Sequence, residues 1–192
     1  MKQPVFTVIA GANGSGKSTL TSGSPDDFSQ FPVLDPDAIA NTIRSSDLHA
    51  VALTAGRRVL ERMESYIEAK KSFAVETTLS GKNYLRTMAV AHQRGFQVVL
   101  VYIGTTNVEI NLARIAARVL VGGHDVPETD VRRRYARSFH HLPSASTLAD
   151  AVILFDNSTE QGYQLVGLGN VNQFQWMESL PRWAAQLRIS LA

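Results

Sequence analysis

The sequence predicts an α/β fold in which helices cover both faces of a mostly parallel central sheet. Three observations predict it. Strand and helix signals alternate along the 192 residues, the strand segments are continuous apolar runs, and no linker or internal repeat divides the chain. Continuous apolar runs are typical of parallel strands that are buried on both faces. We therefore expect one domain over residues 1–192, a length that can bury a full core.

The first half of the chain alternates strands with helices from its start. Val5–Ala10 is an apolar run that ends at Gly11, and Pro36 suits the first turn of a helix. Asp47 is expected to cap a long amphipathic helix, in which apolar residues recur at helical spacing. In chain order we expect a strand at 5–10, a helix from about 17, a strand at 31–34, a helix from 36, a helix over 47–71, a strand at 73–75 and a helix over 82–94.

The second half repeats this alternation, and glycines mark the ends of its helices. Gly95 ends one helix, and the pair at 122–123 separates two others. In chain order we expect a strand at 96–103, a helix from 107 to about 121, a helix from about 127, a strand at 151–155, an edge strand at 163–168 and a closing helix over 176–189 around Pro181.

The charge balance and the absence of cysteine exclude several classes of function. Nineteen Lys and Arg against seventeen Asp and Glu give a formal charge of +2, which is too even to predict binding to nucleic acid or to a membrane. A chain without cysteine has no disulfide framework, no thiolate zinc site and no thiol catalysis. Because the sequence shows no signal-peptide or membrane-spanning apolar segment, we expect a cytoplasmic location.

A phosphate-binding motif follows the first expected strand. Residues 11–18 match G-x-x-x-x-G-K-[ST] in full. Its glycines let backbone N–H groups curl around phosphate oxygens, Lys17 reaches the β- and γ-phosphates, and Ser18 supplies a hydroxyl to magnesium. An ordinary loop is the alternative, but a buried strand before it and a helix after it are the context that the motif requires. We expect ATP and Mg²⁺ as cofactors, a three-layer P-loop kinase fold, and contacts to ATP from Gly11, Ala12, Asn13, Gly14, Ser15, Gly16, Lys17, Ser18 and Thr19.

Two aspartates lie where the second strand should end. The carboxyl ends of parallel strands face the ligand crevice, so Asp35 and Asp37 are expected to look toward the γ-phosphate. Phosphoryl transfer to a hydroxyl needs a base, and we assign that role to Asp37. Asp35 is expected to contact substrate or magnesium-bound water. One of the pair, most naturally Asp35, is also expected to cap the helix that begins at Pro36.

Glu76 and Thr78 occupy the same edge of the sheet, after the third strand. Glu76 is expected to hold substrate hydroxyls or magnesium-bound water, with Thr78 donating a hydrogen bond to substrate. The alternative is that Glu76 ends the strand in solvent and that the threonines only reflect β-propensity and helix capping.

Arginines crowd into one segment that we interpret as a lid over ATP, at about residues 112–141. Two arginine-bearing helices flank Gly122 and Gly123, which are suited to act as hinges, and His124 is expected to fix that hinge. Guanidinium groups match phosphate oxygens in geometry. A solvated basic face or an RNA-binding surface is the alternative. We expect two or three of the arginines in this segment to contact phosphate, with Arg118 and Arg134 as the first choices. The candidates are Arg114, Arg118, Arg132, Arg133, Arg134 and Arg137.

Asp156 and Asn157 follow the last central strand on the nucleotide side, and both are candidates for contact with ATP. Together with Ser158 they also form the pattern of a turn built by Asx and Ser side chains, which is an equally good interpretation. The pair His140–His141 is interpreted as a capping or core element, and no metal is assigned to it.

With these residues assembled, the chain resembles the zeta-toxin family, specifically its small stand-alone members. The resemblance spans nearly the whole chain. The segments that carry it are 11–19, 35–37, 76–78, the lid segment 118–127 with its Gly-Gly-His-Asp-Val-Pro sequence, 133–135 and 156–158. Where related lids tend to carry Asn after the arginine helix, this chain has His141.

The resemblance implies a kinase that phosphorylates a hydroxyl of UDP-N-acetylglucosamine or a related nucleotide sugar. By matching positions, it implies that Lys17 and Ser18 hold ATP and Mg²⁺ and that Asp37 is the base. Glu76 and Thr78 would hold the sugar. It implies phosphate contacts from Arg118 and Arg134, and we add Arg133 as a substrate-binding candidate. It also makes a separate antitoxin protein a candidate partner.

Two other functions remain open from the residues alone. A polynucleotide or nucleoside kinase would use the arginine segment on a nucleic-acid phosphate, and its affinity would fall steeply with salt. A regulatory ATPase would hydrolyse ATP slowly and signal through its conformation. Asp37 discriminates here, because a switch needs no base beside an acceptor hydroxyl. We expect a small-molecule substrate, no membrane partner, and no nucleic-acid partner.

Overall fold

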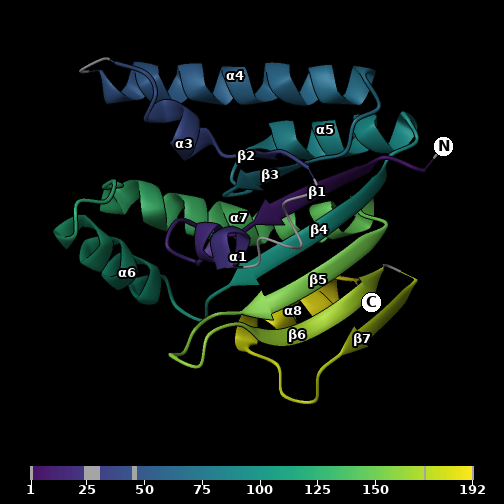
Figure 1. Cartoon of the computed structure of the whole chain (residues 1–192). Helices are drawn as coiled ribbons and strands as arrows, with labels where there is room; N and C mark the ends of the chain where they lie inside the picture. The colour runs from purple at the N-terminus through teal and green to yellow at the C-terminus, as the bar shows by residue number, and fades with distance from the viewer. Residues whose placement is uncertain (1, 24–30, 45–46, 171, 192) are drawn as a thin grey trace.

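The computed structural model describes residues 2–23, 31–44, 47–170 and 172–191. In these segments seven strands form one sheet, in the order β2-β3-β1-β4-β5-β6-β7 (Figure 1). The first five strands in this order run parallel, and β6 and β7 run antiparallel to their neighbours. The mostly parallel α/β sheet that the sequence predicts is confirmed. The strands are β1 (Val5–Ala10), β2 (Val33–Leu34), β3 (Phe73–Thr77), β4 (Gln97–Gly104), β5 (Ala151–Asp156), β6 (Gln164–Asn170) and β7 (Gln173–Trp176).

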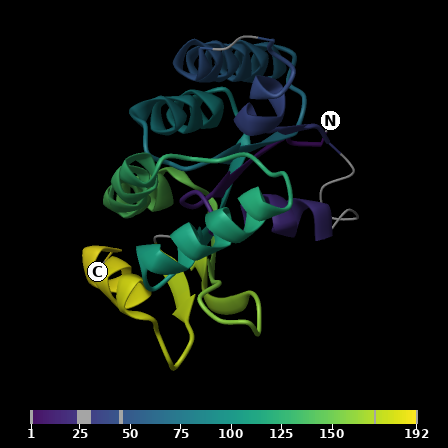
Figure 2. The ribbon, with the colours of Figure 1, turned by 90° about the vertical axis from the view of Figure 1, so that its left-hand side faces the viewer.

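Helices cover the two faces of the sheet unequally. The larger core lies on the face that α4, α5, α7 and α8 cover, whereas α1 packs on the other face through Leu20. The α6 helix lies at the left end of the sheet in Figure 1 and crosses in front of the molecule in Figure 2. No helix within the described ranges is both long and apolar enough to cross a membrane. The helices are α1 (Lys17–Gly23), α3 (Pro36–Ala40), α4 (Leu48–Glu68), α5 (Lys82–Gln93), α6 (Val108–Leu120), α7 (Glu128–Leu148) and α8 (Arg182–Leu191).

Side-chain caps fix where two of the long helices begin. Asp47 accepts a hydrogen bond from the backbone N–H of Ala50 at 3.0 Å, which confirms the capping role predicted for it. Asn107 accepts one from the N–H of Glu109 at 3.0 Å. Each cap satisfies a donor that the first turn of a helix leaves without a partner.

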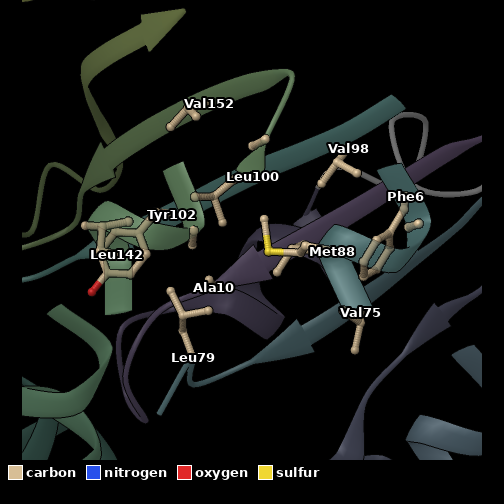
Figure 3. Close-up of a cluster of buried hydrophobic side chains, with 14 of the residues drawn as sticks. Phe6, Ala10, Val75, Leu79, Met88, Val98, Leu100, Tyr102, Leu142 and Val152 are labelled. Atoms are coloured by element: carbon tan, nitrogen blue, oxygen red, sulfur yellow. The ribbon is translucent and has the colours of Figure 1, made fainter. Parts of the chain in front are cut away.

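Aromatic rings and a methionine fill the larger core. The rings of Phe6 and Phe73 stack with centroids 4.5 Å apart, and Phe96 meets Phe73 edge-on at 6.1 Å. Figure 3 shows Met88 of α5 lying between Leu100 of β4 and Phe6 of β1, and all three side chains are fully buried. Dense packing of this kind makes the central strands rigid, and their carboxyl ends therefore hold side chains in fixed positions.

The C-terminal region departs from the sequence prediction. A helix over 176–189 was expected, but Gln173–Trp176 forms the strand β7 and α8 begins only at Arg182. The strand extends the sheet beyond β6, so β6 is not the edge strand that was predicted. Phe174 and Trp176 point to the same side, with ring centroids 4.4 Å apart. Pro181 precedes the helix, and its carbonyl oxygen accepts hydrogen bonds from the N–H groups of Ala184 and Ala185 in the first turn of α8.

Candidate active site

The P-loop motif forms the turn between β1 and α1 and needs glycine at specific positions. Gly14 and Gly16 have positive φ, at 77° and 105°. A Cβ on Gly14 would lie 2.6 Å from the carbonyl oxygen of Asn111, and one on Gly16 would lie 2.5 Å from the side-chain nitrogen of Asn157. Neighbouring elements therefore press directly on the loop backbone, and a larger residue would push them away.

A cavity of about 710 Å³ opens over this loop. That volume suits a nucleotide with part of an acceptor. Its walls come from the P-loop, the ends of β2 and β3, the helices α6 and α7, and the loop after β5. The cavity brings together most of the site residues that the sequence predicts: Asn13, Gly14, Gly16, Lys17, Ser18, Thr19, Asp35, Asp37, Glu76, Thr78, Arg118, Arg134 and Asn157.

Lys17 lies among the carboxylates of this cavity. Its amine donates hydrogen bonds to the carbonyl oxygens of Gly11 and Ala12, at 2.7 and 3.1 Å. Burial lowers the pKa of Lys17, and the negative charges of Glu76 and Asp37 oppose that shift. The amine is thus held by the loop itself, and it shares the cavity with both of these carboxylates.

Glu76 is the second-last residue of β3 and is held by hydroxyl groups of α1. Its carboxylate accepts hydrogen bonds from Ser18 at 2.7 Å and from Thr21 at 2.6 Å, and its side chain is only 4% exposed. The alternative in which Glu76 ends the strand in solvent therefore does not describe it. A buried carboxylate beside the P-loop serine forms a set of hard oxygen ligands that suits Mg²⁺.

Magnesium fits this donor set only together with phosphate oxygens. No group of three or more His, Cys, Asp or Glu side chains that could hold a metal ion occurs in the part of the chain that the structure describes. Mg²⁺ is usually bound by one or two protein ligands and by substrate phosphates, with water completing the shell. Ser18 and Glu76, which share a hydrogen bond, are the residues that would hold such an ion.

Asp35 and Asp37 stand at the start of α3, and their roles differ. Asp35 caps the helix by accepting a hydrogen bond from the N–H of Asp37 at 2.8 Å, as the sequence predicts. Burial raises the pKa of Asp35, and the negative charges of Glu76 and Asp37 raise it further. The hydrogen bond from the N–H of Asp37 acts in the opposite direction and lowers it. Asp37 follows Pro36 in the first turn and lines the cavity. Of the two, Asp37 is therefore the carboxylate left without a capping role.

A strained loop after β3 presents Thr78 to the cavity. Thr78 and Ser80 share a hydrogen bond of 2.9 Å between their hydroxyls. Leu79, fully buried between them, has a φ of 54°, a conformation that non-glycine residues seldom adopt. The Nδ1 atom of His141 on α7 lies 2.8 Å from the carbonyl oxygen of Leu79. His141 is 9% exposed, so of the two sequence interpretations it is the core one that describes it.

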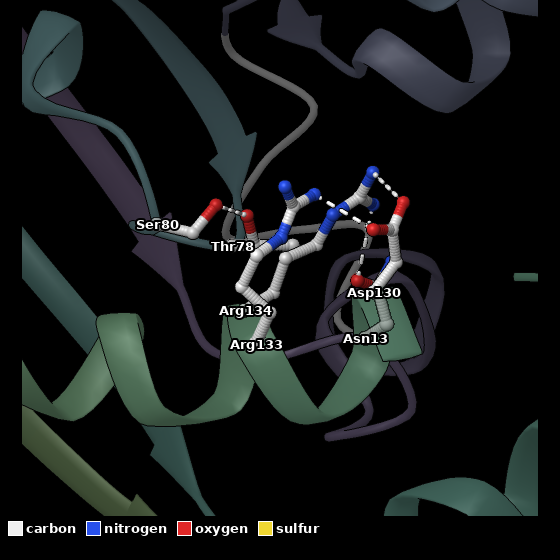
Figure 4. A network of polar contacts seen from close by, with 6 residues as sticks. All are labelled: Asn13, Thr78, Ser80, Asp130, Arg133 and Arg134. Carbon is white, nitrogen blue, oxygen red and sulfur yellow. Dashed lines mark hydrogen bonds and ion pairs between the residues drawn. The ribbon is translucent and has the colours of Figure 1, made fainter. Parts of the chain in front are cut away.

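The predicted arginines divide between the cavity and the surface. Arg134 lines the cavity and contacts Asn13 of the P-loop at 3.3 Å and Asp130 at 3.4 Å (Figure 4). Arg118 also lines it and donates to the carbonyl oxygen of His124 at 2.7 Å, which ties the arginine to the hinge segment. Arg133 instead pairs with Asp130 at 2.7 Å, is exposed, and is not one of the residues that line the cavity.

Asn157 and Asp156 also differ in what they contact. The buried amide of Asn157 donates to the carbonyl oxygen of Ser15 at 2.8 Å and lines the cavity. The carboxylate of Asp156 accepts from the indole N–H of Trp183 at 2.8 Å and from the hydroxyl of Ser158 at 2.9 Å. Asp156 does not line the cavity, and the turn interpretation describes its contacts.

Two residues that shape the site were not predicted from the sequence, and a third, Arg114, was ranked below Arg118 and Arg134. Asn111 of α6 is fully buried and donates to the carbonyl oxygen of Asn13 at 2.7 Å. Tyr163 donates its hydroxyl to the carbonyl oxygen of Gly16 at 2.7 Å. Arg114 lines the cavity although Arg118 and Arg134 were preferred. An asparagine on the apolar side of a helix was a usable signal for Asn111, whereas nothing in the local sequence marks Tyr163.

This fold and this site define a P-loop nucleotide-binding protein of the kinase type. The chain belongs to the zeta-toxin family, because the family model described as zeta toxin matches residues 1–165. An uncharacterized protein of Haemophilus influenzae is 43% identical over 125 residues, which are 65% of this chain and 88% of that protein.

Solved structures share the fold at low sequence identity. The toxin–antitoxin system PezAT of Streptococcus pneumoniae contains a chain with a TM-score of 0.64 and 14% identity, and the match covers 96% of this chain and 77% of that one. The AvrRxo1-ORF1:-ORF2 complex with ATP gives a TM-score of 0.71 and 17% identity, over 99% of this chain and 64% of that one. At these identities the likeness shows the fold.

Proposed function

We propose that this protein is an ATP- and magnesium-dependent kinase that transfers the γ-phosphate of ATP to a hydroxyl of a small molecule. The acceptor that we propose is a UDP-amino sugar such as UDP-N-acetylglucosamine. One observation carries the proposal: Lys17 lines one cavity together with Glu76, Asp37 and Arg118. A phosphate-binding lysine, two carboxylates and an arginine of α6 therefore share one cavity, and their charges act on the amine of Lys17. Membership of the zeta-toxin family supports the kinase assignment.

The proposed roles follow the charges that develop during transfer. Asp37 accepts the proton of the acceptor hydroxyl as its oxygen bonds to the γ-phosphorus, and the bond from that phosphorus to the β,γ-bridging oxygen breaks to leave ADP. Lys17 binds the β- and γ-phosphates, and Arg118 and Arg134 stabilise the charge on the migrating group. Ser18 and Glu76 would hold Mg²⁺, which neutralises phosphate charge when it is bound.

The acceptor side of the cavity lies between α3 and the loop after β3. Asp35, Asp37 and Thr78 line it there, and Tyr84 adds an aromatic wall. Carboxylates and a hydroxyl around one aromatic ring suit the hydroxyls and apolar face of a sugar ring. This arrangement supports a sugar acceptor, and the family resemblance selects the UDP-linked amino sugar among sugars.

The test is mass spectrometry of a panel of UDP-sugars incubated with the protein, ATP and magnesium, with Lys17→Ala as the inactive control. We expect one UDP-amino sugar to gain a phosphate with the wild-type protein alone. If ATP were hydrolysed while no sugar gained phosphate, the acceptor assignment would fall. Nucleic-acid ends would then be tested, because the arginines of α6 and α7 also suit the phosphate of a polynucleotide.

An antitoxin is the protein partner that we propose. The structural match in Streptococcus pneumoniae comes from a toxin–antitoxin system, and the AvrRxo1 structure is also a complex of two proteins. Co-expression with the product of the adjacent gene tests this, with growth of the host as the readout. A kinase that consumes ATP and UDP-sugars would act in the cytoplasm.

A further inference from the structure

Arg114 of α6 carries a buried nitrogen that has nothing to bind. Its Nη1 atom is shielded from solvent and has no hydrogen-bond partner in the part of the chain that the structure describes. Arg118 and Arg134, by contrast, each have a partner. A guanidinium group remains charged at all ordinary pH values, and a buried N–H donor without an acceptor is unfavourable. Because Arg114 lines the cavity, an anionic ligand in the cavity would supply the missing acceptor.

The position of Arg114 follows from the way α6 packs on the P-loop. Asn111 lies one helical turn earlier, donates to the carbonyl oxygen of Asn13, and leaves no room for a Cβ on Gly14. Residues three apart lie on the same face of a helix, so Arg114 and Asn111 face the loop together. Arg114 therefore projects over the glycine-rich part of the motif.

Tyr163 is a second residue that contacts the P-loop near Arg114. Its hydroxyl donates to the carbonyl oxygen of Gly16, and the positive charge of Arg114 is close enough to lower its pKa against the larger effect of burial. Arg118, one turn further along α6, is close enough to Lys17 to lower the pKa of that amine. The charges of the two arginines of α6 thus act on different groups beside the motif: that of Arg114 acts on Tyr163, which binds Gly16, and that of Arg118 acts on Lys17.

We infer that Arg114 binds the α- and β-phosphates of the donor nucleotide, and that it therefore holds ADP as firmly as ATP. In this motif the glycine-rich backbone cradles the α- and β-phosphates, whereas the lysine reaches the β- and γ-phosphates. An arginine over the glycine-rich backbone contacts the α- and β-phosphates, which stay on ADP after transfer. An arginine beside Lys17 contacts the γ-phosphoryl group, which is transferred. The inference rests on the proposed nucleotide site but not on the identity of the acceptor.

The experiment compares the affinities of Mg-ADP and Mg-ATP by calorimetry for wild type, Arg114→Met and Arg118→Met. Methionine keeps about the length of the aliphatic stem of arginine and removes the charged guanidinium group. We expect Arg114→Met to weaken both nucleotides equally, by roughly ten- to a hundred-fold, which is the range for losing hydrogen bonds to a charged group. Arg118→Met is expected to weaken ATP more than ADP. Arg188→Met, at an exposed position on α8, removes the same charge away from the cavity and should bind both nucleotides like wild type.

A second readout separates ligand binding from a structural role. If Arg114 serves the ligand, the ligand-free Arg114→Met protein should melt no lower than wild type, because the substitution removes a buried N–H donor that has no acceptor. If it fails to fold, Arg114→Lys is used, which keeps the charge but loses the planar fork and should weaken both nucleotides equally. Unchanged ADP affinity, or a loss confined to ATP, overturns the inference.

These measurements can refute the proposed acceptor and the proposed nucleotide site separately. A wild-type protein that binds ADP but phosphorylates no UDP-sugar would refute only the proposed acceptor, and the role of Arg114 would still be decided. A wild-type protein that binds neither nucleotide would refute the proposed function and the inference together.

Discussion

The hydroxyl of Ser18 in α1 donates a hydrogen bond of 2.7 Å to the carboxylate of Glu76 in β3. The pairing of β1 with β3 places Ala10 beside Thr77, and so brings the start of the P-loop next to the end of β3. Thr21 donates to the second carboxylate oxygen at 2.6 Å. Both oxygens of Glu76 are thus bound by hydroxyls of α1, and the carboxylate cannot swing away from the P-loop.

Replacing Glu76 by Gln should therefore alter the response to magnesium before it alters the affinity for nucleotide. The amide keeps the size of the side chain but removes the negative charge that suits a hard cation. We expect a higher magnesium concentration at half-maximal rate and a lower kcat, whereas binding of ADP in EDTA should stay near the wild-type level. Rates measured across a magnesium series check this, with the exposed Glu61→Gln on α4 as the matched control. An unchanged magnesium dependence would remove Glu76 from the metal site.

Asp37→Asn should abolish phosphoryl transfer while ATP still binds. A positioned general base contributes about 10²- to 10⁴-fold to a rate, and asparagine cannot accept the proton. We expect kcat for the acceptor to fall by that factor and the affinity for ATP to change little, because the phosphates are held by other residues. Single-turnover experiments measure the rate of transfer to the acceptor, and calorimetry measures the affinity for ATP. If Asp37→Asn retained all ATP turnover, the protein would be better described as a regulatory ATPase.

The sequence predicts the site best where a short motif and a strand end coincide. Lys17, Ser18, Asp37 and Glu76 all follow buried strands or the P-loop, and the carboxyl ends of parallel strands bring them together in one cavity. The sheet order was not needed for this prediction, because the carboxyl ends of all parallel strands lie on the same side of the sheet. That is why residues far apart in sequence line one cavity.

Contacts that depend on the packing of distant elements were not predicted. Tyr163 reaches the P-loop from the segment before β6, and only the antiparallel pairing of β6 with β5 places it there. Likewise, the contact of Trp183 with Asp156 requires α8 to pack beside β5. The helix expected from Trp176 was wrong for a related reason, since its pairing with Gly167 in the neighbouring strand overrides the local pattern.

Asp35→Asn should reduce the dependence of stability on pH and leave the helix capped. Burial raises the pKa of Asp35, so the folded protein holds its proton more tightly than the unfolded chain. The stability that this group contributes is present below its unfolded pKa and is lost as pH rises through the folded pKa. Asparagine caps helices as well as aspartate and has no such proton. Urea unfolding from pH 3.5 to 7 gives the unfolding free energy as a function of pH. Its slope should be less negative for the variant, by about the contribution of one carboxyl group. A slope equal to that of wild type would mean that other groups dominate.

His141→Ala should impair the acceptor side of the site and spare the nucleotide side. The substitution leaves the buried carbonyl of Leu79 without its partner, which costs about 1–3 kcal/mol of unfolding free energy, and releases a loop whose φ of 54° is held in place by its surroundings. Because that loop presents Thr78 to the cavity, we expect KM for the acceptor to rise while the affinity for ADP stays unchanged. The neighbouring His140→Ala, at an exposed position of the same helix, is the matched control and should behave like wild type. His141→Asn asks whether a shorter amide can still reach the carbonyl, and rescue of KM by this variant would show that the hydrogen bond matters rather than the ring. Equal losses of acceptor and ADP affinity in His141→Ala would instead indicate that α7 as a whole had shifted.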